Sequence, residues 1–213
     1  MVYLARTTEG IIVIDLGWWG SRKVVRTALR ELGASPAQVT DVFLTHSHRD
    51  HIGSWRLVGH SRFHVAEAER SLLFGEKPFR AWIPRWAERL KPRDVPKPNE
   101  IDVRAFSGDT AFAFGLDTLR AFVVPGHTAG STVYLFRGVL FLGDAATYTP
   151  WGGFGSARRG YSDDHRTAAV SLAGLWAHIP DGAVRTVCTA QAHCRPYTFD
   201  LAEQLHGGRG PRP

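Results

Sequence analysis

The chain has 213 residues, of which 44% are hydrophobic and 22% charged, and it carries a formal net charge of +6. This composition is typical of a globular domain and excludes wholesale disorder, a collagen-like chain and a disulfide-dense miniprotein. The apolar runs are too short to span a bilayer and the N-terminus lacks a signal-peptide pattern, so we expect a cytoplasmic protein with no membrane partner.

Strand and helix patterns alternate through the first half of the chain. The expected elements are strands over 2–6, 11–15, 42–44 and 63–65, a helix from Ser21 to Gly33 and a helical stretch after His51. The first two strands flank a turn signal, so we expect them to form a hairpin. Pro78 and Pro84 interrupt a helical pattern over 67–92. The proline-rich segment 91–100 is predicted to be an exposed loop.

Strands dominate the second half of the chain. The expected strands cover 101–105, 111–114, 119–124, 132–136, 139–142 and 184–188. Asp163 or Asp164 is a suitable N-cap for a helix that runs to about His178, and a short helix is expected near 200–205. The predicted apolar face of the longer helix consists of Val170, Leu172, Leu175 and Trp176.

The organisation, the charge and the cysteines narrow the possibilities further. No linker divides the chain, so we predict one layered domain over 1–213, with 207–213 as a frayed tail. The arginines are scattered along the chain, so we interpret the positive charge as a background trait and disfavour a nucleic-acid partner. Cys188 and Cys194 are too few for a disulfide framework, and reduced thiols are expected, although the two could pair.

The strongest chemical signal is a cluster of metal-ligand residues directly after the predicted buried strand 42–44. His46, His48, Asp50 and His51 lie within six residues. In an extended chain alternate side chains share a face, so His46 and His48 can point to one metal ion. A turn there can direct Asp50 and His51 to a neighbouring position. Imidazole and carboxylate groups are suitable ligands for zinc. A polar loop without a metal would rarely contain these residues at this spacing by chance.

Three further residues that can bind metal follow other predicted strands. His127 lies in a Pro-Gly turn after one strand, Asp144 follows a second, and His193 follows a third. A lone histidine in such a place is more often a surface or core residue. Because all three come just past strand ends, they can converge with the cluster on one edge of the fold.

The order and spacing of these residues resemble the metallo-β-lactamase-fold superfamily of metal-dependent hydrolases. The matching features are His-x-His-x-Asp-His at 46–51, Pro-Gly-His at 125–127, Gly-Asp at 143–144, the final His193 and Ile-Asp-Leu-Gly at 14–17. The resemblance covers nearly the whole chain. It implies an α+β fold, a four-layer αββα sandwich with two mixed β-sheets, and a metal site at the sheet edge.

The resemblance also implies two Zn²⁺ ions, with iron or manganese as alternatives. Carried over to this sequence, the family pattern assigns His46, His48 and His127 to the first ion. It assigns Asp50, His51 and His193 to the second ion, and Asp144 bridges the two. Asp15 is expected to support the motif loop without touching metal.

The implied chemistry is hydrolysis. Two divalent ions about 3.5–4 Å apart would share a water and supply hydroxide at neutral pH, which Asp50 would orient. Family β-lactamases commonly carry Cys or Ser where this chain has Asp144, whereas thioesterase-like, lactonase and phosphodiesterase members carry Asp. Lactonases also place a tyrosine three residues beyond that Asp. Here Thr147 occupies that position, and Tyr148, one residue later, is a candidate to hold the substrate carbonyl.

The expected substrate wall is aromatic. Its candidate residues are Trp18, Trp19, Trp82, Trp86 and Trp151. We therefore predict an enzyme that hydrolyses an ester, lactone or thioester of a small-molecule substrate with an apolar acyl part, which an acyl carrier could present. A β-lactamase and a phosphodiesterase or nuclease are the alternatives on the same site. A nucleic-acid-binding protein that uses the basic surface is the alternative of another class, and the oligomeric state is not predicted.

Overall fold

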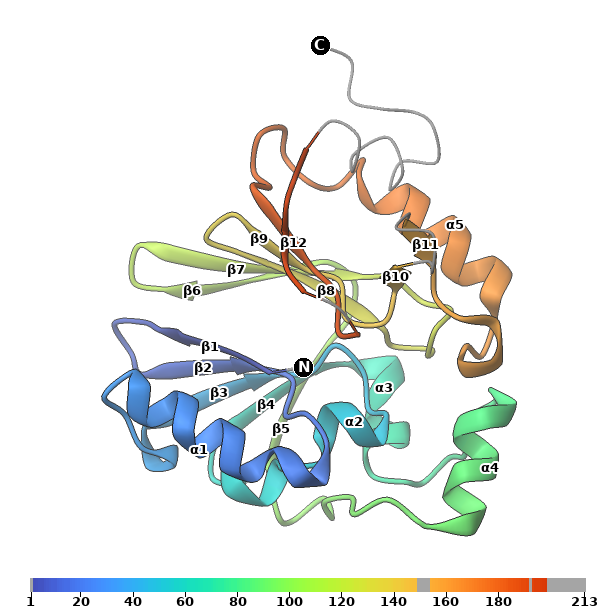
Figure 1. The fold of residues 1–213 in the computed structure, drawn as a ribbon, viewed down its shortest axis with the longest axis horizontal. Coiled ribbons are helices and arrows are strands. Elements are labelled where there is room, and N and C mark those ends of the chain that lie inside the picture. Colours follow the sequence, from blue (N-terminus) through green and yellow to red (C-terminus); the bar gives the residue numbers. More distant parts are fainter. Residues whose placement is uncertain (1, 149–153, 192, 199–213) are drawn as a thin grey trace.

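Two β-sheets form the centre of the computed structural model, which describes residues 2–148, 154–191 and 193–198 (Figure 1). The first sheet has the order β1-β2-β3-β4-β5, antiparallel between its first two strands and parallel elsewhere. Its strands are β1 (Tyr3–Arg6), β2 (Ile11–Ile14), β3 (Val39–Phe43), β4 (Arg62–Ala66) and β5 (Asp102–Phe106). The predicted hairpin is confirmed as β1 and β2.

The second sheet has the order β13-β12-β9-β8-β7-β6 and is antiparallel except between β9 and β12. Its strands are β6 (Thr110–Phe114), β7 (Asp117–Val123), β8 (Thr132–Phe136), β9 (Val139–Phe141), β12 (Thr186–Cys188) and β13 (Arg195–Pro196). A separate small hairpin consists of β10 (Ala146–Tyr148) and β11 (Phe154–Ser156). Both large sheets are therefore mixed, as predicted.

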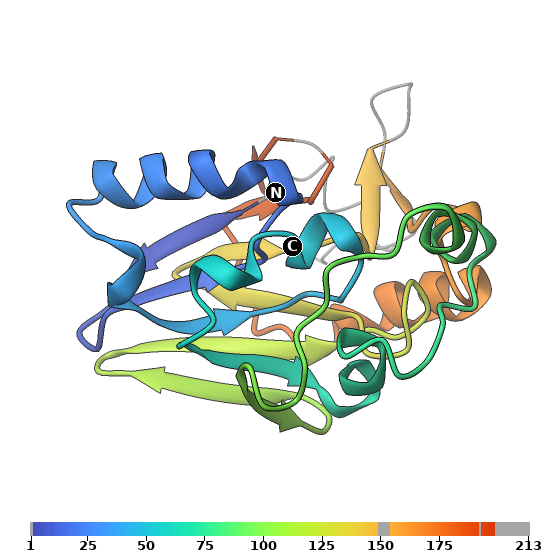
Figure 2. The same ribbon diagram turned by 90° about the horizontal axis from the view of Figure 1, so that it is seen from below.

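Helices cover the outer faces of the two sheets and gather at one end of the sandwich (Figures 1 and 2). The α-helices are α1 (Arg22–Glu31), α2 (Arg49–Ile52), α3 (Glu67–Leu73), α4 (Trp82–Leu90) and α5 (His165–Leu175), and the 3₁₀ turns are η1 (Trp19–Ser21), η2 (Pro36–Gln38), η3 (Trp55–Leu57) and η4 (Arg159–Tyr161). The order helix, sheet, sheet, helix confirms the αββα sandwich. No helix in the described part of the chain has the length and apolar character needed to cross a membrane.

Three apolar cores correspond to the three contacts between the four layers. Because successive side chains of a strand point to opposite faces of its sheet, a strand can contribute residues to two of these cores. In β2, Ile11 and Val13 pack in the core beneath α1, whereas Ile12 and Ile14 pack between the sheets. In β8, odd-numbered residues face the α5 core and even-numbered residues face the first sheet. Near-continuous apolar strands are thus explained by burial on both faces.

The structure corrects several sequence-based expectations for the helices. The pattern over 67–92 forms two separate helices, α3 and α4, rather than one interrupted helix. Pro84 fits the first turn of α4 because backbone N–H groups there need no intrahelical partner. Helix α5 begins after the N-cap Asp164 and ends at Leu175. Val170 is 67% exposed, so its place in the apolar face was wrong.

Some predicted segments lie outside the described residues. They are the short helix near 200–205, the tail 207–213 and Trp151. Tyr148 closes β10, but its side chain falls outside the described part as well.

A buried hydrogen bond joins the two sheets beside the motif loop. The Tyr134 hydroxyl, from β8, donates to the Leu44 carbonyl at 2.8 Å. Tyr134 is fully buried, and Leu44 directly follows β3. This contact fixes the second sheet against the strand end from which the histidine motif emerges.

Replacing Tyr134 by Phe should lower the free energy of unfolding by about 1–3 kcal/mol, because the Leu44 carbonyl loses its donor in a buried position. Chemical denaturation measures the change. Tyr161→Phe is the control, since Tyr161 is 41% exposed and should change stability by less than about 0.5 kcal/mol. Equal stability of Tyr134→Phe and the parent protein would contradict the proposed link.

Candidate metal centre

Three buried histidines present ring nitrogens to one another at the carboxyl-side ends of the strands. Nε2 of His46 lies 3.0 Å from Nδ1 of His48, and Nε2 of His127 lies 3.2 and 3.1 Å from these two atoms. Nitrogens bound to one tetrahedral zinc at about 2.0–2.1 Å lie about 3.3 Å apart. The triangle therefore fits a divalent metal ion.

The three imidazoles are neutral at physiological pH. Burial lowers the pKa of His46 and of His48 well below the usual value, and the neighbouring histidines lower both further. Burial likewise lowers the pKa of His127 to about 4, against the opposing charge of Asp144. A neutral imidazole is the form that binds metal, so protonation does not compete strongly at this triangle.

A second group of ligand atoms adjoins the triangle and shares one carboxylate with it. Nε2 of His51 lies 3.8 Å from both Oδ2 of Asp50 and Oδ1 of Asp144. The other oxygen of Asp144 lies 3.7 Å from Nε2 of His127. His46, His48, His127 and Asp144 thus form one potential metal site, and Asp50, His51 and Asp144 form another. Asp144 stands between the two.

His51 carries a different electrostatic environment from the triangle. Burial alone would lower the pKa of His51, but the charge and hydrogen bond of Asp15 and the charges of Asp50 and Asp144 raise it to about 9. Nε2 of His51 has no hydrogen-bond partner among the described residues although it is buried. An orphaned nitrogen between two carboxylates is a suitable place for a cation.

The Asp15 carboxylate holds the motif loop in place through hydrogen bonds. One carboxylate oxygen accepts from the Thr45 backbone N–H at 2.8 Å, and the other accepts from the Thr45 hydroxyl at 2.8 Å. That second oxygen also lies 2.8 Å from Nδ1 of His51. Asp15 adopts a positive φ of 57°, a backbone conformation that is uncommon outside glycine. This conformation aims the carboxylate at Thr45 and His51, which leaves Nε2 of His51 directed into the site.

Glu69 joins the two loops that carry the histidine triangle. It lies in α3, is 1% exposed, and its Oε1 accepts from the backbone N–H and hydroxyl of Ser47. Its Oε2 accepts from the Thr128 hydroxyl at 2.7 Å and from the Gly130 N–H at 3.1 Å. Burial raises the pKa of Glu69, although these four donors oppose the shift. Ser47 separates His46 from His48, and Thr128 follows His127, so Glu69 fixes all three histidines relative to one another.

The sequence did not single out Glu69. It comes three residues after β4 and therefore carries the same signal as the predicted ligands, a polar residue just beyond a strand. Arg93 and Gln191 were also missed. Arg93 contacts the Ser47 and Leu72 carbonyls, pairs with Glu88 and lies over the Phe79 ring, which connects the motif loop to α4.

The structure does not bring His193 to the other ligand types. His193 is exposed and belongs to neither group. Gln191 lies nearer, with Nε2 at 3.2 Å from Oδ2 of Asp50 and 3.4 Å from Oδ1 of Asp144. The sequence pattern could not distinguish these two positions, because both follow the same strand β12.

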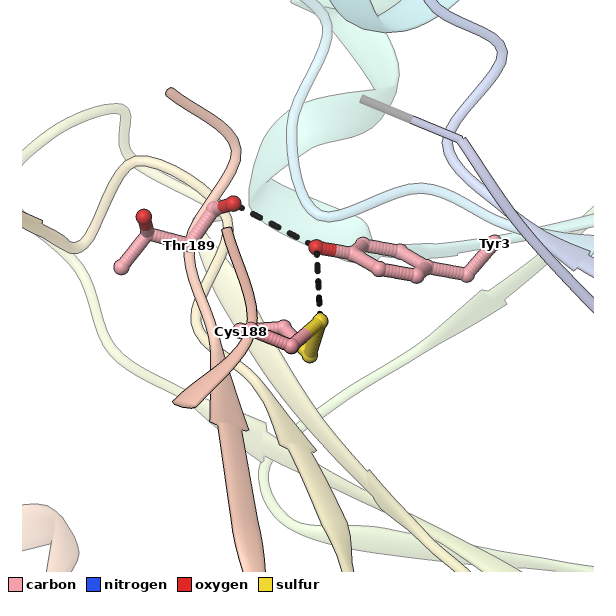
Figure 3. Close-up of a disulfide and its surroundings, with 4 residues drawn as sticks. Tyr3, Cys188 and Thr189 are labelled. Carbon is pink, nitrogen blue, oxygen red and sulfur yellow. Dashed lines mark hydrogen bonds between the residues drawn. A yellow bond between two sulfur atoms is a disulfide. The ribbon is translucent and has the colours of Figure 1, made fainter. Parts of the chain in front are cut away.

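A disulfide closes the loop that carries Gln191 and His193. Cys188 and Cys194 are bonded, which corrects the expectation of reduced thiols. They face each other because β13 turns back antiparallel beside β12. Figure 3 shows the Tyr3 hydroxyl beside the disulfide, where it donates to the Thr189 carbonyl at 3.3 Å. The disulfide therefore restrains the loop, and the Tyr3 hydrogen bond connects it to the first sheet.

A cavity of about 340 Å³ opens over the two groups. Its apolar lining includes Trp18, Phe79, Ile83, Pro84, Ala87 and Tyr161, and its polar lining includes Arg49, Asp50, Asp144, Thr147, Arg158 and Gln191. The ring of Phe79 also packs edge-on against His48. An apolar wall beside a cluster of ligand atoms is the usual composition of a small-molecule site.

The predicted aromatic residues occupy different places around this cavity. Trp18 lines it, whereas Trp19 lines a smaller neighbouring pocket. Trp82 and Trp86 are exposed and do not belong to the cavity lining, which α4 supplies through other residues. His165 is the first residue of α5; its Nδ1 lies 2.8 Å from the Ala157 carbonyl oxygen, and it does not line the cavity.

Comparison with known proteins identifies the family. The model of the metallo-β-lactamase superfamily matches residues 1–177, so the chain belongs to this superfamily. It is similar to a metallo-β-lactamase family protein of Thermus thermophilus (23% identity, TM-score 0.65, covering 97% of this chain and 72% of that chain). It is also similar to a subclass B3 metallo-β-lactamase of Bradyrhizobium japonicum (22% identity, TM-score 0.61, covering 88% and 70%). These likenesses show the shared fold.

Curated relatives resemble the chain at 30% identity. They are an uncharacterized protein, YobT, of Bacillus subtilis (67% of this chain, 60% of that protein), metallo-beta-lactamase domain-containing protein 1 of Xenopus laevis (58% and 47%), and a hydroxyacylglutathione hydrolase of Halorhodospira halophila (99% and 72%). The chain thus spans about half to three fifths of the length of the first two.

Glu69→Gln should weaken metal binding by about 10–100-fold, because an amide cannot accept from both loops at once. Titration of zinc against a chelator measures the affinity. Glu67→Gln is the matched control, since Glu67 lies on the same helix but is exposed. Unchanged zinc affinity in a folded Glu69→Gln protein would show that Glu69 does not position the histidines.

Proposed function

We propose that the protein is a metal-dependent hydrolase that holds two zinc ions and cleaves an ester, lactone or thioester bond of a substrate with an apolar acyl part. The observation that best supports this proposal is the position of Asp144, whose carboxylate belongs to both ligand groups at the base of an apolar cavity. The Halorhodospira halophila relative is named as a hydrolase of hydroxyacylglutathione, an acyl compound, which supports an acyl substrate.

The donor set fits the implied metal. The neutral imidazoles of His46, His48 and His127 and the nearby carboxylates are ligands that zinc accepts. The buried His51 Nε2 has no partner among the described residues, and His51, whose pKa is raised, would release its proton to bind an ion there. His46, His48 and His127 would hold the first ion, Asp50 and His51 the second, and Asp144 both. Bound there, divalent cations supply Lewis acidity and make water a stronger acid.

In the proposed reaction Asp50 accepts and passes on the proton, and Gln191 orients the carboxylates of the site. Burial raises the pKa of Asp50, but the charge of His51 and hydrogen bonds that include Gln191 bring it below its usual value. Asp50 is therefore ionised at neutral pH and can accept a hydrogen bond from an attacking water, then pass a proton to the leaving atom. The Gln191 side-chain amide donates to the carboxylates of both Asp50, at 3.2 Å, and Asp144, at 3.4 Å, and so orients them.

The cavity walls position the substrate. An acyl chain would lie against Phe79, Ile83 and Ala87, and Trp18 would cover it from a second segment. Arg49 and Arg158 offer positive charge to an anionic group, such as that of an acyl-carrier-bound substrate. Tyr148, one residue beyond the position at which lactonases carry their tyrosine, is proposed to hold the substrate carbonyl. A cavity of this shape suits a small molecule better than a nucleic-acid strand.

In this proposal His193 is the seventh ligand and joins Asp50 and His51. Because His193 belongs to neither group of ligand atoms, this role requires the loop after β12 to move toward Asp50 and His51. The disulfide between Cys188 and Cys194 restrains that loop.

His193→Ala should reduce the zinc content from two ions per chain to one, because only the second group loses a ligand. Elemental analysis after dialysis measures the content. Gln191→Ala provides the comparison, and should leave two ions bound. If Gln191→Ala lost the second ion and His193→Ala kept it, the assignment would pass from His193 to Gln191.

Zinc-loaded protein should hydrolyse an acyl thioester, ester or lactone faster than a β-lactam or a phosphodiester in a panel of these substrates. Asp144→Asn should lower the rate by at least about 100-fold, since even residues that only support a metal ligand commonly contribute 10–100-fold. Asp181→Asn, at an exposed loop position, is the control. Preference for the β-lactam or the phosphodiester would replace the proposed reaction with one of the two alternatives.

A further inference from the structure

Helix α4 presents an uncovered apolar stripe at the mouth of the cavity. Trp82, Trp86 and Leu90 are 64%, 58% and 67% exposed. They follow one another at intervals of four residues, so they lie in one row along the helix. Single exposed apolar residues are ordinary, but a row of two tryptophans and a leucine marks an interaction surface.

Cationic side chains border this stripe. Arg85 and Arg89 are exposed, and at about 100° per residue they lie beside the two tryptophans. Neither arginine forms an ion pair with the described residues. The one acidic residue of the helix, Glu88, is engaged by Arg93 and lines the cavity instead. The exposed face of α4 therefore combines apolar side chains with positively charged ones.

The stripe continues into the cavity. Ile83 and Ala87 follow Trp82 and Trp86 by one residue each, and both line the cavity wall. Trp18, 42% exposed, adds apolar surface to the same mouth from the segment after β2. Helix α4 therefore contributes apolar side chains both to the outside of the molecule and to the wall of the cavity.

We propose that this α4 face docks on an anionic lipid bilayer and that the acyl substrate enters the cavity from that surface. Helices that lie on membranes combine tryptophan and leucine with arginine, because the rings bury at headgroup depth while the cations meet anionic lipids. Arg85 and Arg89, which form no ion pair within the described residues, give the charge complementarity that favours this occupant over an uncharged apolar partner. Entry of the substrate rests on the proposed function, whereas docking does not.

This proposal refines the expectation of no membrane partner. That expectation followed from the absence of an apolar run long enough to span a bilayer. A helix that lies on the surface needs no such run.

Cosedimentation of the full chain with vesicles tests the docking without any substrate. We expect binding to phosphatidylcholine vesicles that contain phosphatidylserine, with a blue shift of tryptophan emission, and weaker binding at high salt. The double variant Trp82→Ser, Trp86→Ser should bind at least about tenfold more weakly. Arg85→Gln with Arg89→Gln should lose about tenfold on anionic vesicles and little on pure phosphatidylcholine.

Leu116→Ser is the matched control. Leu116 is an apolar residue that is fully exposed, but it lies in the turn between β6 and β7, at the opposite end of the sandwich from α4 (Figure 1). Its replacement should leave vesicle binding unchanged. Circular dichroism shows that each variant is folded.

Three results would overturn the proposal. The parent protein fails to bind anionic vesicles, or it binds them equally well after the α4 substitutions. Alternatively, sedimentation shows a dimer that the double tryptophan variant dissociates, which assigns the stripe to a second copy of the chain. Because binding is measured without hydrolysis, failure of docking and failure of the proposed reaction are separate results.

Discussion

The candidate site depends on holding three neutral imidazole nitrogens within 3.2 Å of one another in a buried place. Such nitrogens gain little from facing each other, so the arrangement must be imposed by the surroundings. Two buried carboxylates do this. Asp15 contacts the two ends of the motif loop, at Thr45 and His51. Glu69 contacts Ser47 within that loop and Thr128 in the loop of His127. Their hydrogen bonds hold the histidine nitrogens in place.

The sandwich brings these carboxylates and histidines to one end. Asp15 follows β2, the motif follows β3 and Glu69 follows β4, all in the first sheet. His127 and Asp144 follow β7 and β9 in the second sheet. The core between the sheets, with Phe43 and Tyr134 at its centre, sets their separation. The two ligand groups therefore form only where the two sheets meet.

Most strands and the candidate ligands that follow them were predicted from local patterns, a buried strand followed by a polar residue that can bind metal. The sandwich and the grouping of His46, His48 and His127 followed from the resemblance to the metallo-β-lactamase superfamily. The sequence did not predict Glu69, whose partners Ser47 and Thr128 are separated from it by 22 and 59 residues and become neighbours only through packing. The division of 67–92 into two helices, the disulfide and the outward position of His193 also depend on tertiary contacts. Motif spacing carries no information about such contacts.

In the proposed centre, Asp144 serves two metal ions at once. A crystal structure of the zinc-loaded protein, with anomalous scattering recorded at the zinc edge, would locate both ions. We expect two peaks, one against the triangle of His46, His48 and His127 and one against Asp50 and His51, each contacting an oxygen of Asp144. A single peak, or a pair of which only one contacts Asp144, would contradict this role of Asp144.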